Sequence, residues 1–558
     1  IISLLLSLAV IFALNSRINS IPPLGKFMNP VSGFWANAET EDPADHMFAY
    51  RIPGLKEEVK IIFDERRVPH IFANNEHDLF LAQGYVTAMH RLFQMELQTY
   101  DAAGRLSELL GENTGAQNRD LNTRRWGMPW AAEKKLEAIK QDSGSWAILQ
   151  AYAKGVNAWI DALDPAEYPI EYKVLDIAPE EWTPLKTGLL HMNMSRTLAG
   201  GSSDDRTSNT IAYFGEEYVE NMFGTRARAL EPIIPEGTEW DFMADLPPAP
   251  DSLFLGSTAE KVQYFESDMG VGSNNWAVAG SKTQSGYPIL AGDPHLSLSM
   301  PSIWMELQLH APGYNVYGVA FQGIPGILIG FNEHLAFTET NVGSDVLDWY
   351  EIKFKDETKD EYWYNEKWHP TTKRIEEIKV RGGESIIDTL VFTHHGPVMQ
   401  VFAGDSASAP VYHAMRWIAH EAGNSLKTFI GLNRARNYEE YREALKNYIA
   451  PAQNFLVATR EGDIGITVNG QFPNKWKYQG RTVSDGSDPA YDWQGWIPNE
   501  HNPSMKNPER GFVSSANQAS AGVDYPYYLG EDFAPYERSR RINDLLREMD
   551  NITPQDMM

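Results

Sequence analysis

Ser273 follows a glycine and opens an apolar segment, in the run VGSNNW at residues 271–276. In an intact chain, a Gly-Ser pair before a strand is most often a turn. A serine freed by cleavage of the Gly272–Ser273 bond would instead carry its own general base, because a terminal α-amine has a pKa of about 7.7–8.0. Its hydroxyl could attack the Gly272 carbonyl to free itself, and glycine permits the strained approach that this needs. Ser273 is therefore either a turn residue or a nucleophile.

Signatures of other catalytic classes are missing from the sequence. It contains no G-x-S-x-G, S-x-x-K, H-E-x-x-H or G-x-x-x-x-G-K-[ST] motif, which disfavours a nucleophile-elbow esterase, a serine β-lactamase, a zincin and a P-loop enzyme. There is no cysteine, which excludes disulfides, cysteine nucleophiles and thiolate metal sites. The 75 acidic residues outnumber the 48 basic ones, and the formal charge of −27 argues against a nucleic-acid partner.

The segments on either side of Ser273 have different periodicities. Before it, residues 58–75 predict a strand, a charged turn and a strand, and a helix follows with apolar residues at spacings of three and four: Leu79, Ala82, Val86, Met89, Phe93 and Leu97. After Gly272, short apolar runs punctuated by proline and glycine predict strands, and helical patterns return after about residue 437. Strands flanked by helices predict an α+β layered architecture.

Other segments fall outside this pattern. Residues 231–272 are rich in proline and acid, have no period, and predict a linker or an excised spacer. The first fifteen residues are almost wholly apolar, which fits the h-region of a secretory signal or an uncleaved membrane anchor better than a buried core helix. We therefore expect residues 1–20 to direct export to the periplasm or cell surface, with or without a membrane tether. A missing initiator Met and a helix start at Thr553 and Pro554 lead us to expect more chain at both ends.

Ordered motifs from about residue 58 to 546 resemble those of the penicillin acylase family of N-terminal-nucleophile hydrolases, which includes penicillin, cephalosporin and N-acyl-homoserine-lactone acylases. The first half carries VPHIFA (68–73), DLFLAQGYV (78–86), HRLFQMEL (90–97) and GRLSELLG (104–111); the second half carries GSNNWAVAGSKTQSG, GDPHL, TNVGSDVLD and GFVSSANQ. The resemblance implies a four-layer αββα sandwich. It also implies a helix-rich α-subunit region at 36–235, a spacer at 236–272 and a β subunit at 273–558, separated by autoproteolysis between Gly272 and Ser273.

By the same resemblance, the protein would hydrolyse the amide bond of a small N-acyl compound through an acyl-enzyme on Ser273. Its partners would be that substrate and the α and β fragments of one precursor, and it would need no organic cofactor. The rival interpretation is a catalytically inactive binding protein at the cell surface that kept the fold. The joint presence of Ser273, His295, Asn517 and a spacer argues against this rival.

The resemblance also implies roles for individual residues around Ser273. His295, in GDPHL, matches a histidine of cephalosporin and homoserine-lactone acylases where penicillin G acylases have glutamine, and would hydrogen-bond near the Ser273 amine and hydroxyl. The oxyanion would be bound by the backbone N–H of Val342 and the side chain of Asn517. Arg538 would hold Asn517 in place, with Arg540 and Arg541 as neighbouring alternatives. Alternatively, His295 is a structural histidine at a strand end and Asn517 is a turn asparagine.

A metal site and an acyl pocket complete the implied site. Asp345 and Asp348 match a stretch that often binds Ca²⁺, and a third carboxylate would come from Asp205 or its neighbour Asp204; solvated acids are the alternative. Leu296 and Ile329 fall where penicillin G acylases line the pocket with phenylalanine, unless both are simply core residues. Aliphatic walls predict a preference for aliphatic acyl groups over phenylacetyl.

Overall fold

The computed structural model of the chain describes residues 1–17, 22–38, 49, 51–223, 231–257, 259–261, 271–403 and 410–558. Its central element is a nine-stranded sheet in the order β1-β2-β6-β7-β8-β9-β17-β18-β20. The bounds of these strands are β1 Lys60–Phe63, β2 Pro69–Phe72, β6 Trp304–Ala311, β7 Tyr314–Phe321, β8 Ile329–Asn332, β9 Leu335–Asn341, β17 Gln453–Thr459, β18 Ile464–Asn469 and β20 Ser504–Lys506. The strand–turn–strand predicted at 58–75 is the antiparallel pair β1 and β2, which joins this sheet by running parallel to β6.

Most of the first half of the chain is helical. The helices are α1 Ile2–Leu14, α2 Leu24–Phe27, α3 Trp35–Ala38, α4 Glu76–Ala103, α5 Ser107–Leu110, α6 Thr114–Arg125, α7 Met128–Lys140, α8 Ser143–Ile160, α9 Ile170–Leu175, α10 Pro184–Ala199, α11 Asp204–Phe214 and α12 Glu216–Phe223. Three more follow in the second half: α13 Leu426–Arg434, α14 Tyr438–Leu445 and α15 Glu537–Glu548. The predicted helix-rich N-terminal region is therefore confirmed, whereas its bounds at 36 and 235 stay a prediction.

Helix α4 is the long helix predicted from the apolar spacing. Its first half is buried on all sides, whereas Leu97, predicted on the buried stripe, is exposed. The last turns bury Leu92 and Met95 instead, because they pack in a separate cluster with residues of α8 and α10. Glycine lets α4 and α8 meet closely: a Cβ at Gly155 would lie 1.8 Å from the Leu81 carbonyl oxygen.

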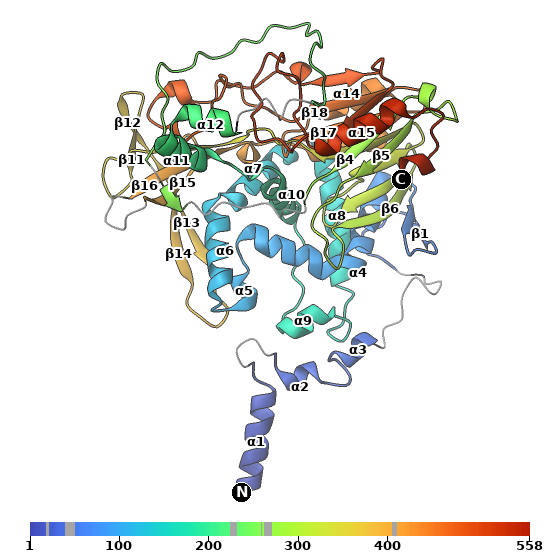
Figure 1. Cartoon of the computed structure of the whole chain (residues 1–558). Helices are drawn as coiled ribbons and strands as arrows, with labels where there is room; N and C mark the ends of the chain where they lie inside the picture. Colours follow the sequence, from blue (N-terminus) through green and yellow to red (C-terminus); the bar gives the residue numbers. More distant parts are fainter. Residues whose placement is uncertain are drawn as a thin grey trace.

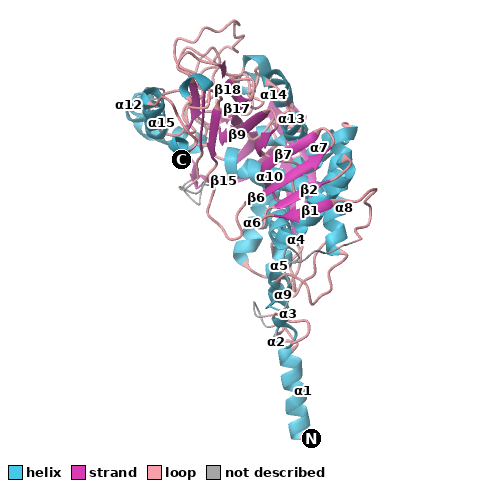
Figure 2. Cartoon of the chain, turned by 90° about the vertical axis from the view of Figure 1, so that its right-hand side faces the viewer, coloured by secondary structure: helices cyan, strands magenta, loops and turns pink. Residues whose placement is uncertain are grey.

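A small sheet lies on one face of the nine-stranded sheet and carries the serine of interest. It has the order β21-β4-β5, with bounds β4 Asn274–Val278, β5 Ile289–Asp293 and β21 Phe512–Ser515. Strands β4 and β5 contact β9 and β17, and α15 covers β21 from outside (Figure 1). On the opposite face of the large sheet, α4, α13 and α14 contact its strands (Figure 2). The resulting order is helix, sheet, sheet, helix, so the predicted α+β class and four-layer αββα sandwich are confirmed.

A second large sheet lies beside this sandwich. Its seven strands run β13-β14-β15-β16-β10-β19, with β3 paired to β15. Their bounds are β3 Ala259–Lys261, β10 Leu347–Glu351, β13 Thr372–Ile378, β14 Ile386–Phe392, β15 Pro397–Ala403, β16 Val411–Trp417 and β19 Ser484–Asp485; a hairpin of β11 (Glu361–Tyr364) and β12 (Lys367–Pro370) flanks them. Strand β10 follows β9 after five residues, so the two sheets are linked at the TNVGSDVLD motif.

Two segments were predicted to lie outside the core. The apolar helix α1 extends away from the rest of the molecule (Figure 1), and none of the described helices is long and apolar enough to span a membrane. The described part of the predicted spacer, 236–257, packs on the second half of the chain: Phe242 stacks on His501 with ring centroids 3.9 Å apart, and Trp240 contacts Tyr525. Residues 262–270 of that spacer lie outside the described residues.

Candidate functional site

Ser273 lies at the start of the central strand of the small sheet. It immediately precedes β4, which pairs with β21 on one side and β5 on the other. Asn517 follows the end of β21 by two residues, so the sheet brings Ser273 and Asn517 to one edge. Both are buried, with 6% and 8% of their surfaces exposed. The backbone of Asn517 has a φ of 65°, a left-handed conformation that few non-glycine residues adopt outside turns and functional sites.

Hydrogen bonds join Ser273, Asn517 and Arg538. The Ser273 N–H donates to Asn517 Oδ1 at 2.8 Å. Arg538 donates to the same Oδ1 at 3.0 Å, to the Ser273 carbonyl oxygen at 2.9 Å and to Asn274 Oδ1 at 2.8 Å. Arg540 instead stacks on Tyr536, so Arg538 is the arginine that the structure places against Asn517. One guanidinium thus fixes both the serine backbone and the asparagine side chain.

The Gly272 carbonyl lies beside the Ser273 hydroxyl. Ser273 Oγ donates to the Gly272 carbonyl oxygen at 2.6 Å. The Gly272 N–H donates to the His295 carbonyl oxygen at 2.9 Å. A Cβ at position 272 would lie 2.7 Å from His295 Nε2, so only glycine fits here without displacing the imidazole. The structure therefore gives a steric reason for the glycine, in addition to its conformational freedom.

The His295 ring lies beside Gly272 and is about one-third exposed. Its Nδ1 is 3.1 Å from both the backbone oxygen and Oδ2 of Asp293. Among the described residues, neither ring nitrogen hydrogen-bonds Ser273. His295 thus lies next to Gly272 and is oriented by Asp293 through Nδ1, and its expected hydrogen bond near the Ser273 amine and hydroxyl stays a prediction.

The predicted backbone donor, Val342, is already engaged. Its N–H donates to the Ala452 carbonyl oxygen at 3.1 Å, which continues the antiparallel ladder of β9 and β17 by one residue pair. The expectation of a free Val342 donor is therefore not met in the uncleaved chain. Because hydrogen-bonded and non-hydrogen-bonded pairs alternate in such a ladder, the N–H and carbonyl of the preceding residue, Asn341, face away from β17. That carbonyl accepts a hydrogen bond from Asn517 Nδ2 at 2.9 Å, so Asn341 directs its backbone toward the site.

A cavity extends from Ser273 between the large sheet and the helices. Leu296 and Ile329 line it, as predicted for acyl-pocket residues, together with aromatic side chains that the sequence analysis missed: Trp304, Phe321, Phe429 and Tyr448. Helices α7 and α10 supply Lys135, His191 and Met194, and β9 supplies Glu339 and Asn341. The walls are mostly apolar, which suits a hydrocarbon chain. Lys135 is buried and donates to the Glu421 carbonyl oxygen at 3.0 Å, and burial lowers its pKa to about 8.

Comparison with known proteins identifies the family. The family model described as penicillin amidase matches residues 58–558. The chain belongs to the penicillin amidase family. It is 30% identical to penicillin acylase 2 proenzyme of Pseudomonas sp. (strain SE83), over 89% of this chain and 63% of that protein. It is also 30% identical to acyl-homoserine lactone acylase QuiP of Pseudomonas aeruginosa, over 88% of this chain and 59% of the relative.

A solved structure of penicillin G acylase from Alcaligenes faecalis aligns with a TM-score of 0.45 at 25% identity, covering 51% of each chain. The chain spans 59–63% of the length of the two curated relatives.

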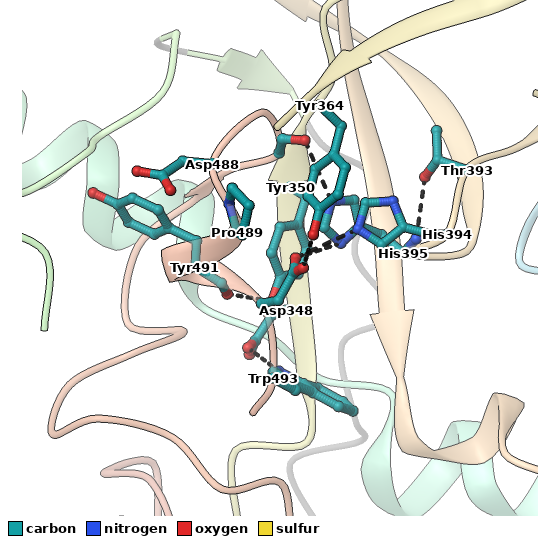
Figure 3. Close-up of polar contacts among 12 residues, drawn as sticks. Asp348, Tyr350, Tyr364, Thr393, His394, His395, Asp488, Pro489, Tyr491 and Trp493 are labelled. Atoms are coloured by element: carbon teal, nitrogen blue, oxygen red, sulfur yellow. Dashed lines mark hydrogen bonds and ion pairs between the residues drawn. The ribbon is translucent and has the colours of Figure 1, made fainter. Parts of the chain in front are cut away.

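Asp345 and Asp348, the two acids expected to bind calcium, hold a lysine between them. Lys475 Nζ donates to Asp348 Oδ1 at 2.7 Å and to the Asp345 carbonyl oxygen at 3.1 Å, and lies 3.2 Å from Asp345 Oδ2. The other oxygen of Asp348 accepts from Trp493 Nε1 at 2.6 Å (Figure 3). Burial alone would lower the pKa of Lys475, but the two carboxylates raise it. The lysine is therefore a buried cation held by two acids.

The third carboxylate beside this pair is Asp204, not Asp205. Asp204 accepts the Trp349 N–H at 2.9 Å, and burial together with the charge of Asp348 raises the pKa of Asp204 well above its usual value. Asp205 instead faces His413, with Oδ1 3.4 Å from Nδ1. The two acids open α11, where consecutive side chains point about 100° apart. Of the two candidates, Asp204 therefore lies beside Asp345 and Asp348, whereas Asp205 faces His413.

The space between these acids is already occupied by a side chain. Calcium takes about six to eight oxygen ligands. Here the ammonium of Lys475 stands between the carboxylates that would supply them. The residues do not fit a calcium ion in this arrangement.

A second polar cluster holds the loop that carries Trp493. His394, His395 and Asp492 each bring a potential metal-ligand atom within 4.8 Å of one another (Figure 3). Tyr364 donates to Asp492 Oδ2, and the Tyr362 hydroxyl lies 2.8 Å from His394 Nδ1. Burial lowers the pKa of His395 to about 3, so its ring is neutral. The cluster holds the turn after β14 against residue 492. It thereby fixes the position of the next residue, Trp493, which donates to Asp348.

Proposed function

We propose that this protein is an N-terminal-nucleophile amidohydrolase that cleaves the amide bond of small N-acyl compounds. The observation that carries the proposal is the hydrogen bond from the Ser273 nitrogen to Asn517 Oδ1, with Arg538 holding both residues. The nitrogen that would become the free α-amine is thus already bound within the site, and the serine hydroxyl lies beside the carbonyl of the bond to be cleaved.

Maturation begins with attack of Ser273 Oγ on the Gly272 carbonyl carbon. The C–N bond breaks, the nitrogen keeps its electron pair and takes up the hydroxyl proton, and an ester links Gly272 to the serine oxygen. Water then hydrolyses this ester and leaves a carboxylate on Gly272 and a free hydroxyl and α-amine on Ser273. The His295 imidazole, packed against Gly272, is placed to assist proton transfer.

In the mature enzyme the α-amine accepts the hydroxyl proton, through a water molecule, as Oγ attacks the substrate carbonyl. The proton passes to the leaving nitrogen, an amine departs, and an acyl-enzyme remains. Water attacks that ester and releases a carboxylic acid. The oxyanion is stabilised by Asn517 Nδ2 and one backbone N–H. We predicted Val342, but its N–H bonds Ala452, so we propose the N–H of Asn341 instead. No organic cofactor takes part.

The apolar cavity beside Ser273 supports an acyl substrate, and the relatives named penicillin acylase and acyl-homoserine lactone acylase support the N-acyl class. With Leu296 and Ile329 on its walls, we expect aliphatic acyl groups to be preferred over phenylacetyl. Comparison of kcat/KM for octanoyl, dodecanoyl and phenylacetyl amides checks this, and faster phenylacetyl cleavage would contradict it. We further propose a periplasmic or cell-surface location, from the apolar residues 1–20.

A denaturing gel with N-terminal sequencing tests the proposed function. The expressed protein should give a fragment that begins SNNWAV and should hydrolyse N-acyl amides, and Ser273→Ala should give neither. A single intact chain without hydrolytic activity would instead support the inactive binding protein.

A further inference from the structure

Three side chains, those of His394, His395 and Asp492, direct one donor atom each toward a common point. The turn between β14 and β15 supplies the two imidazoles, whose rings lie side by side (Figure 3). Asp492 follows the short 3₁₀ helix Pro489–Tyr491 and supplies the carboxylate. Within the described part of the chain, no other group of three His, Asp or Glu side chains brings its donor atoms within 4.8 Å of one another.

The separations of these atoms match the edge of a metal-centred tetrahedron. Asp492 Oδ1 lies 3.5 Å from His394 Nε2 and 3.6 Å from His395 Nδ1. Hydrogen bonds between nitrogen and oxygen are shorter, at about 2.7–3.2 Å. Zinc bonds of about 2.0–2.1 Å at the tetrahedral angle place neighbouring ligand atoms about 3.3–3.4 Å apart. The two distances are therefore long for direct hydrogen bonds and close to those of two ligands on one ion.

The carboxylate oxygen at the common point has no hydrogen-bond partner. Asp492 Oδ1 is buried and accepts no hydrogen bond from the described residues, although Oδ2 accepts from the Tyr364 hydroxyl. Asp348, a buried acid close by, shows the usual arrangement, with one oxygen bonded to Lys475 and the other to Trp493. Because buried polar groups are nearly always paired, the bare oxygen of Asp492 indicates a ligand that the protein does not itself supply.

The outer atoms of the two imidazoles are held as metal-binding histidines require. His395 Nε2 lies 3.4 Å from the Gly486 carbonyl oxygen. A carbonyl accepts only from an N–H, so this neutral ring carries its proton on Nε2 and directs the lone pair of Nδ1 to the common point. His394 Nδ1 lies 2.8 Å from the Tyr362 hydroxyl, which leaves Nε2 free to bind. Such contacts at the second nitrogen orient the ring and are typical of metal ligands.

We propose that His394, His395 and Asp492 bind one divalent transition metal ion of the zinc class, with water in a fourth position. Two imidazoles and one carboxylate suit Zn²⁺, whereas Ca²⁺ and Mg²⁺ prefer oxygen ligands. The His394 side chain is 36% exposed, which gives the ion a path from solvent. The ion would join the turn after β14 to the loop of Trp493, the partner of Asp348, and so stabilise both. This site does not depend on the proposed amidohydrolase chemistry.

The test measures the metal bound by the purified, untagged chain after chelator treatment and dialysis. We expect one Zn²⁺ per chain, and Co²⁺ in the same site should give the visible absorption of a tetrahedral ion. His394→Gln and Asp492→Asn should each lower the affinity for zinc at least tenfold. Tyr362→Phe removes a contact of His394 but no ligand, and should lower the affinity by about 10–100-fold.

His70→Gln is the matched control for these variants. His70 also lies 3.6 Å from a carboxylate, that of Asp64, but the pair belongs to no three-residue group among the described residues. This variant should bind zinc as wild type does. Near-ultraviolet circular dichroism of each metal-free variant should match that of wild type, which separates loss of a ligand from loss of the fold.

Melting temperatures of the metal-free proteins provide a second readout. Zn²⁺ should raise the melting temperature of wild type and of His70→Gln but not of His394→Gln, and Ca²⁺ should change none of them. Absence of zinc binding by wild type, or zinc binding that survives both His394→Gln and Asp492→Asn, would overturn the proposal. Because neither readout uses amide hydrolysis, such a result would leave the proposed function standing.

Discussion

Replacing Lys475 by Met removes the only cation that touches Asp345 and Asp348 among the described residues. Loss of one partner from a buried ion pair costs about 3–5 kcal/mol, because an uncompensated charge stays buried. Lys475 is 1% exposed and Asp348 is fully buried, so solvent does little to reduce this cost. Asp204 adds a third carboxylate nearby. Without the Lys475 ammonium, the three carboxylates are better suited to a divalent cation.

We therefore expect Lys475→Met to unfold several degrees below wild type in chelator and to recover when calcium is added. A calcium concentration one hundred times the dissociation constant would restore about 2.7 kcal/mol. Wild type should show the same melting temperature in chelator and in calcium. Lys427→Met breaks an exposed pair with Asp142 and should cost less than about 1 kcal/mol with no calcium response. A wild-type protein that loses stability in chelator, or a Lys475→Met protein that ignores calcium, would refute the reasoning.

Three further results are expected. Gly272→Val, whose Cβ would lie 2.7 Å from an imidazole nitrogen, should leave an intact chain on a denaturing gel, whereas Gly201→Val, which has open space around it, should mature normally. In the fraction that matures, Arg538→Met should lower kcat by about 10²–10³-fold, as for loss of an oxyanion donor, with little change in KM; Arg540→Met is the control, and an equal loss there would contradict the assignment. The pKa of Glu339 is raised to about 8. The stability that its protonated side chain contributes to the folded protein is therefore fully present below about pH 4.3 and is lost as pH rises toward 8. Urea unfolding should show wild type losing up to about 1.4 kcal/mol per pH unit relative to Glu339→Gln in that window, and parallel curves would count against the buried acid.

The sequence predicted the residues that lie within a few positions of one another in a motif. Ser273 opens its strand as expected, and Asn517 and Arg538 lie where the motifs placed them. The features that the sequence did not predict depend on contacts between residues far apart in the chain. Whether the Val342 N–H is free depends on its register with Ala452 on another strand, which local spacing does not encode. Lys475 and Asp348 are 127 residues apart in the chain, so no residue near the acidic motif predicts this contact.

Glu339 could have been noticed from its position. It stands between Phe337 and Asn341 in a period-two pattern, and an acid on the inward face of a predicted strand conflicts with burial unless it has a partner. The sequence does not reveal that its buried Oε2 makes no hydrogen bond to the described residues, because every candidate partner comes from elsewhere in the fold. Sequence patterning finds such conflicts, and the structure decides whether the protein or a ligand resolves them.

The residues on both sides of the Gly272–Ser273 bond are held by other parts of the site. On one side of the bond, the Gly272 N–H is held by His295; on the other, the Ser273 carbonyl is held by Arg538. The future amine and the future oxyanion donor belong to one contact, since Asn517 binds the Ser273 nitrogen through Oδ1 and the Asn341 carbonyl through Nδ2. Under the proposed mechanism, cleavage would leave the nitrogen in place and free the chain before it, and a local shift of Asn517 away from the Asn341 carbonyl would then expose Nδ2 to substrate. We therefore expect the site to act on its own bond first and to bind an external amide only afterwards.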